Sequence, residues 1–177
     1  MNSKKSKLNQ PFVFLVLAIF LTGIIGYFVP WSERERPAPD ITFVLTDGKK
    51  LSLSSLHGRP VLISFWATTC KICIAKTPEM NALYQQLAPK GFEMVAVAMP
   101  YDPPTHVLTV SNNLGMPYPV ALDLKAEAVR AFGDVKVTPT TFLISPAGNI
   151  VWHNKGKFSS QRLKKRIVKL IRDYKRL

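Results

Sequence analysis

Cysteine is scarce in this sequence: the 177 residues contain only two, Cys70 and Cys73. A bridge between them closes a very short loop, so the chain lacks the disulfide framework that stabilises many small secreted domains. Three scattered histidines accompany them, which does not give the ligand spacing of a four-ligand zinc site. The two cysteines therefore indicate a shared chemical role rather than a structural one.

Acidic residues are also few, with 11 of them against 24 lysines and arginines and a formal net charge of +13. Residues 155–177 alone carry ten basic side chains and a single acid, Asp173. Such an excess favours an anionic neighbour, which could be lipid headgroups, nucleic acid or an acidic protein. Low-complexity segments are absent and 47% of the residues are hydrophobic, which excludes intrinsic disorder and allows one domain with a core.

One long segment lacks charge altogether, from Phe12 to Val29. A helix of this length reaches across the hydrocarbon core of a bilayer. Lys4, Lys5 and Lys7 precede it without an acid, so the positive-inside rule keeps the N-terminus in the cytoplasm. A cleaved signal peptide is the alternative, but the apolar run is long for one and no A-x-A-like cleavage site follows. The predicted organisation is a cytoplasmic basic tail (1–10), a transmembrane signal anchor (11–30), a charged linker (31–39) and an extracytoplasmic domain (40–177).

The rest of the chain alternates strand and helix patterns. Strands are predicted at 41–45, 50–53, 60–67, 92–99, 140–145 and 149–153, and helices at 72–87, 105–114, 125–132 and 159–174. We expect Thr105 to cap the second helix, and we expect Ile72, Ala75, Leu83 and Leu87 to form the inner face of the first. This order predicts an α/β domain with a mixed sheet and helices on both faces.

The cysteine pair falls between a predicted buried strand and a predicted helix. Helix N-termini favour anions because their N–H groups are free and the helix dipole is positive there. Lys71 and Lys76 add positive charge nearby, so we expect the pKa of Cys70 to lie below that of a free thiol. Cys73, one turn further and more buried, is placed to resolve a mixed disulfide. Two inert packed thiols are the alternative interpretation.

Two motifs carry a family resemblance. The segment Ser-Phe-Trp-Ala-Thr-Thr-Cys-Lys-Ile-Cys (64–73), with Pro78 after it, and the segment Val-Thr-Pro-Thr-Thr-Phe-Leu-Ile (137–144) resemble the thioredoxin superfamily. They are similar to its TlpA/ResA-like branch of bacterial membrane-anchored thiol–disulfide oxidoreductases. The resemblance covers roughly residues 40–175. It implies a thioredoxin-like fold with an inserted element after the second core strand, at about residues 101–132.

The resemblance also assigns roles to individual residues. It implies that Cys70 attacks and Cys73 resolves, with their disulfide as the redox group and no other cofactor. Pro139 would be the cis-proline facing the disulfide, and Thr138 would offer backbone groups to a bound substrate chain. Trp66, Lys71 and Lys76 would tune the site, with Trp66 as a wall of it. Implied partners are proteins with thiols or disulfides and a membrane electron donor of the dithiol-transfer kind.

The sequence departs from the family pattern at three places, one of them Thr69, where many relatives have tryptophan just before the first cysteine. Ser64 stands where thioredoxin has a buried aspartate, and Lys76 stands where relatives of the cytochrome-maturation type often have glutamate. The resemblance favours a reductase, possible roles being cytochrome c maturation or related periplasmic redox maintenance. The two lysines favour a dithiol oxidase, since a low cysteine pKa stabilises the reduced form. A copper carrier using His153 as a third ligand is a further alternative, and a peroxidase ranks last.

The location implied is the bacterial inner membrane, with a single span and the catalytic domain on the periplasmic side. Nucleic acid is excluded as a partner there. The basic C-terminal helix is then either a solvated face whose lysine and arginine stems cover apolar surface, or a contact with anionic lipid.

Overall fold

A computed structural model describes residues 36–176 of the chain. The predicted basic tail and transmembrane anchor, and the first part of the predicted linker, lie outside these residues. Between Arg36 and Arg176 no helix combines the length and the apolar character that crossing a membrane requires.

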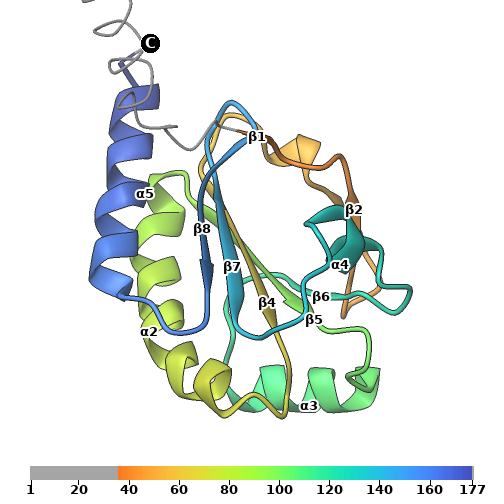
Figure 1. The fold of residues 1–177 in the computed structure, drawn as a ribbon. Helices are drawn as coiled ribbons and strands as arrows, with labels where there is room; N and C mark the ends of the chain where they lie inside the picture. The colour runs from red at the N-terminus through yellow and green to blue at the C-terminus, as the bar shows by residue number, and fades with distance from the viewer. Residues whose placement is uncertain (1–35, 177) are drawn as a thin grey trace, which may run out of the picture. The chain divides into compact units, whose positions relative to one another are not determined.

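The centre of the domain is one eight-stranded mixed sheet with the strand order β1-β8-β7-β4-β5-β6-β2-β3 (Figure 1). Its strands are β1 (Arg36–Pro37), β2 (Thr42–Leu45), β3 (Lys50–Ser52), β4 (Val61–Trp66), β5 (Glu93–Ala98), β6 (Val120–Leu122), β7 (Thr140–Ile144) and β8 (Asn149–Lys155). Strands β4, β5 and β6 run parallel to one another, β7 pairs antiparallel with β4, and β8 pairs antiparallel with β7. The predicted mixed sheet of a thioredoxin-like fold is confirmed.

The two central strands β4 and β5 are apolar on both faces because helices cover both. Leu62 and Ile63, adjacent in β4, have no exposed surface and belong to separate core clusters on opposite faces of the sheet. Side chains alternate between the faces of a strand, so a continuous apolar run is what a strand in this position requires. The site is therefore attached to the most deeply buried part of the domain.

Four α-helices surround the sheet within the described chain: α2 (Lys71–Leu87), α3 (Pro104–Asn113), α4 (Glu127–Ala131) and α5 (Ser160–Tyr174). Short 3-10 turns lie at Ser54–Leu56 and Ala88–Lys90. Helices α2 and α5 lie side by side on one face, where Leu83, Leu87, Leu163 and Ile167 share a core cluster (Figure 1). Helix α4 contributes Ala128 to the cluster on the opposite face.

The predicted inner face of α2 is wrong in part. Leu83 and Leu87 are buried, but Ile72 is 40% exposed and Ala75 is exposed. The buried positions of the N-terminal half are Cys73, Thr77 and Met80 instead. The face is rotated because the sheet contacts the helix on the side of its second cysteine, and neither a cysteine nor a threonine marks that side by hydrophobicity alone.

Three further details differ from the sequence-based expectations. Thr105 is not the cap of α3: the helix begins with Pro104, after Pro103 in extended conformation, and has no side-chain cap. Proline suits the first helical position because its fixed φ fits a helix and its missing N–H would have no partner within the helix. The three-residue strand β6, which directly follows Pro119, was not predicted. Residues 36–37 of the predicted linker pair with β8 as an edge strand of the sheet.

Candidate active site

The two cysteines lie at the N-terminus of α2, as the pattern predicts. Cys70 is the N-cap residue, with extended backbone, and its Sγ accepts a hydrogen bond of 3.2 Å from the backbone N–H of Cys73. The two residues form a disulfide with a Cα–Cα distance of 5.2 Å. Cys73 is 7% exposed, whereas Cys70 is half-buried. The more accessible sulfur thus sits at the positive end of the helix dipole.

An acid that the sequence did not single out holds the loop in front of Cys70. Asp102, in the turn after β5, is 4% exposed. One of its oxygens accepts the backbone N–H of Thr68 and the other accepts the hydroxyl of Thr68, each at 2.6 Å. Because the partners are 34 residues apart in sequence, no local pattern reveals this contact. It fixes the turn that connects β4 to the disulfide.

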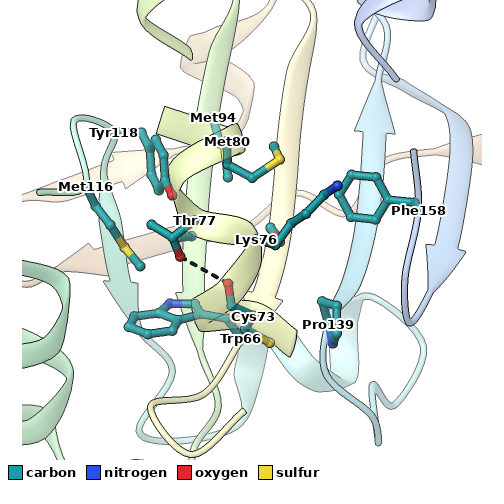
Figure 2. A pocket seen from close by; sticks show the side chains of 12 residues that line it. Trp66, Cys73, Lys76, Thr77, Met80, Met94, Met116, Tyr118, Pro139 and Phe158 are labelled. Atoms are coloured by element: carbon teal, nitrogen blue, oxygen red, sulfur yellow. Dashed lines mark hydrogen bonds between the residues drawn. The ribbon is translucent and has the colours of Figure 1, made fainter. Parts of the chain in front are cut away.

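Pro139 lies next to the disulfide with a cis peptide bond to Thr138. Its carbonyl accepts the backbone N–H of Gly156 at 2.7 Å, and the hydroxyl of Thr140 donates to the carbonyl of Val137 at 2.7 Å. Pro139 and Cys73 line the same small cavity (Figure 2). The motif at 137–140 and the cysteine motif, about 70 residues apart, are thereby brought together.

The cavity behind Cys73 has a volume of about 30 Å³, which is room for a single water molecule. Trp66 forms one wall, and among the described residues its buried indole Nε1 has no hydrogen-bond partner. Thr77 donates to the carbonyl of Cys73 at 3.1 Å. Ser64 also lines the cavity, and its hydroxyl and that of Thr141 are hydrogen-bonded at 3.4 Å. Ser64 thus lies in the cavity next to Cys73 without bringing a carboxylate to it.

Lys76, predicted to tune the cysteines, is already paired. Its Nζ lies 2.7 Å from Oε2 of Glu79. It also lies 5.2 Å from the ring centre of Phe158, beside which Figure 2 shows it. The hydroxyl of Ser160 donates to the same carboxylate oxygen at 2.6 Å. The hydrogen bond from Lys76, then that from Ser160, holds the pKa of Glu79 below its usual value. The charge of Lys76 is largely compensated, whereas Lys71, next to Cys70, has no ion-pair partner among residues 36–176.

Metal-ligating side chains do not converge in the described part of the chain: residues 36–176 contain no group of three His, Cys, Asp or Glu able to hold a metal ion. The ring of His153 stacks on Phe142 with centres 4.5 Å apart. The copper-carrier alternative, which needs His153 as a third ligand to the cysteine pair, gains no support from this placement.

Comparison with known families decides the relationship. The Redoxin family model matches residues 33–169. The match covers most of the chain and every strand of the sheet. The chain belongs to the Redoxin family. The match includes the cysteine pair, the cis-proline loop, all of helix α2 and most of helix α5.

Curated relatives specify the branch. The thiol-disulfide oxidoreductase ResA of Bacillus thuringiensis subsp. konkukian is 31% identical over 175 residues, 94% of this chain and 98% of the relative. ResA of Bacillus subtilis is 36% identical over 153 residues, 84% of each chain. This redoxin is therefore an enzyme of the thiol–disulfide oxidoreductase class, similar to ResA, with the pair Cys70–Cys73.

A solved structure agrees with the fold. The thiol:disulfide interchange protein of the thioredoxin family from Chlorobium tepidum has a TM-score of 0.71 and 29% sequence identity, covering 78% of this chain and 97% of that one. The predicted resemblance to the thioredoxin superfamily and its ResA-like branch is confirmed.

Proposed function

We propose that this redoxin reduces disulfides in protein substrates outside the cytoplasm, with Cys70 as the attacking and Cys73 as the resolving residue. The observation that carries this assignment is the unequal exposure of the two sulfurs at a helix N-terminus: Cys70 can be reached by a substrate, and the buried Cys73 cannot. Thiolate is the nucleophile in such exchange, and the helix N-terminus and Lys71 favour it at Cys70.

The proposed exchange proceeds in two steps. The Cys70 thiolate attacks one sulfur of a substrate disulfide, forming a mixed disulfide and releasing the other substrate sulfur as a thiolate. The Cys73 thiol loses its proton and attacks Sγ of Cys70, which closes the Cys70–Cys73 disulfide and releases the second substrate thiolate. Two electrons pass from the enzyme to the substrate. A membrane-bound dithiol donor would return the enzyme to the reduced state, and no cofactor besides the cysteine pair takes part.

The surrounding residues take supporting roles in this proposal. Thr138, half-buried before the cis-Pro139, presents backbone groups to the substrate chain next to the disulfide. Trp66 forms a wall of the cavity behind Cys73. Lys71 tunes Cys70 electrostatically, and Lys76 acts more weakly because Glu79 compensates its charge.

The proposed location rests on the N-terminal sequence. A basic tail (1–10), a single transmembrane anchor (11–30) and a linker (31–39) would place the domain on the periplasmic side of a bacterial inner membrane. Substrates there include those of cytochrome c maturation or of related redox maintenance. The outer side of α5 carries exposed cations such as Lys165 and Lys169, and this charge supports contact with anionic lipid. Nucleic acid is not a partner in this setting.

The decisive experiment is trapping with the variant Cys73→Ala. Without the resolving thiol, Cys70 should remain linked to its substrates, and these mixed disulfides should appear on non-reducing gels and be identified by mass spectrometry. The Cys70→Ala variant, produced at the same level, is the matched control and should trap nothing. Absence of trapped proteins in cells that produce Cys73→Ala contradicts the exchange mechanism.

The alternative direction, a dithiol oxidase, is favoured by the unpaired Lys71 next to Cys70. The two directions differ in the reduction potential of the pair, which equilibration in glutathione buffers measures. We expect a value near that of thioredoxin, about −270 mV, whereas a value near −120 mV would assign the protein as an oxidase.

A further inference from the structure

A groove larger than the cavity behind Cys73 runs beside the disulfide. It has a volume of about 360 Å³. One wall is the first turns of α2, beginning at Lys71, and the other is the segment 156–158 between β8 and α5. Pro139 lines both this groove and the cavity behind Cys73. A polypeptide whose sulfur reaches Cys70 therefore has this groove within reach of its neighbouring side chains.

The walls of the groove are apolar in part. Ile72 is 40% exposed on the α2 side, and the half-buried ring of Phe158 lies on the other side. Ile72 is one of the two residues that the sequence wrongly placed on the inner face of α2. Such surface suits the aliphatic part of a peptide side chain, which would cover it on binding.

The charge of the groove is positive and not compensated. Three lysines line it, Lys71, Lys76 and Lys157, against one acid, Glu79. The carboxylate of Glu79 is engaged by Lys76 and by Ser160. Lys71 and Lys157 are exposed, and within residues 36–176 neither has an acidic group within ion-pair distance. The two walls of the groove therefore each contribute one lysine without an ion-pair partner among the described residues.

We propose that this groove selects polypeptide substrates that carry aspartate or glutamate within a few residues of their reactive cysteine. The proposal rests on the proposed function, since the groove acts only on chains that exchange with Cys70. An acidic side chain would lie between Lys71 and Lys157, with its methylene groups on Ile72 or Phe158. The carboxylate of Glu79 is not expected to attract basic substrates, because its charge is already compensated by Lys76.

The expected size of the preference follows from the exposure of the lysines. Exposed ion pairs are weak and are screened by salt. Two of them together should favour an acidic over a neutral substrate by about three- to ten-fold in rate at low ionic strength. The groove therefore ranks substrates and does not act as an all-or-none filter.

The test uses two synthetic peptides with one internal disulfide each, one with glutamate flanking the cysteines and one with glutamine at the same positions. The reduced full-length protein in non-ionic detergent is mixed with each, and second-order rate constants are measured by acid quenching and mass spectrometry. A small uncharged disulfide, 2-hydroxyethyl disulfide, reports the intrinsic reactivity of Cys70, and each peptide rate is divided by it. We expect the glutamate peptide to react about three- to ten-fold faster.

Three comparisons locate the effect in the groove. The double variant Lys71→Gln/Lys157→Gln should react with both peptides at nearly equal normalised rates. The matched control Lys90→Gln/Lys125→Gln removes the same charge at exposed positions outside the groove and should keep the preference. About 1 M salt, which shortens the Debye length to about 3 Å, should abolish the preference in the unmodified protein.

The outcomes separate the two proposals. Equal peptide rates, with the uncharged disulfide still reacting, would overturn the groove but leave the exchange function intact. A preference that survives in the groove variant, or that disappears equally in the control variant, would also overturn the groove as the selecting site. Failure of every disulfide to react would refute the exchange function itself.

Discussion

At the scale of single residues, Asp102 is the least expected part of the site. Its buried carboxylate accepts two hydrogen bonds of 2.6 Å from Thr68, and Thr68 is two residues before Cys70. In Asp102→Asn the amide group would present N–H to one of these donors, leaving it unsatisfied. Hydrogen bonds to charged groups contribute about 1.5–3 kcal/mol each. We therefore expect the variant to lose about 2–3 kcal/mol of unfolding free energy in urea titrations.

The matched control for this prediction is Asp47→Asn. Asp47 also bonds two donor groups of a single residue, Lys49, but it is exposed. Its substitution should change the unfolding free energy by less than about 0.5 kcal/mol. If the two variants are equally stable, the contact between Asp102 and Thr68 does not fix the loop as argued.

At the scale of secondary structure elements, α2 offers a direct test of which face it buries. Leu87 has no exposed surface and Ile72 is 40% exposed on the same helix. Leu87→Ala should cost about 2–5 kcal/mol of unfolding free energy because a cavity remains in the core. Ile72→Ala should cost less than about 0.5 kcal/mol. Guanidinium unfolding of the two variants, monitored by circular dichroism, measures both; equal losses would mean that the rotation of α2 is wrong.

The same helix shows how the site and the fold share residues. The buried face that anchors α2 begins at Cys73 and continues through Thr77 and Met80. Burying the second cysteine is thus part of packing the helix on the sheet. The neighbouring positions Lys71 and Ile72 turn outward as a consequence, and this is what supplies the groove with its cation and its apolar wall.

At the scale of the whole molecule, the proposed anchor and location predict how the chain is exposed in a cell. In intact bacterial cells treated with a mild reductant, a membrane-impermeant maleimide should label Cys70. In a variant without Cys70 and Cys73, a cysteine introduced as Ser3→Cys in the basic tail should be labelled only after lysis. Mass shifts on gels measure both. Labelling of Cys70 only after lysis would place the domain in the cytoplasm and refute the proposed topology.

Much of this protein is determined by the sequence alone. The continuous apolar runs that become β4 and β5, the cysteine pair between a strand and a helix, and the hairpin at 140–153 all follow from local patterns. Such patterns are readable because buried strands require apolar side chains at every position and because turns require particular residues. They were enough to indicate the thioredoxin-like fold and the disulfide pair.

Only the tertiary structure decided which groups meet across long stretches of chain. It brought Asp102 to Thr68 and Pro139 to the cavity of Cys73. The pairing of Lys76 with Glu79, by contrast, follows from their i,i+3 spacing on α2. Burial and the rotation of a helix depend on contacts between segments far apart in the chain, and no local pattern encodes those contacts. The two cysteines were therefore evident from the sequence, but the distant segments that meet around their disulfide were settled by the fold.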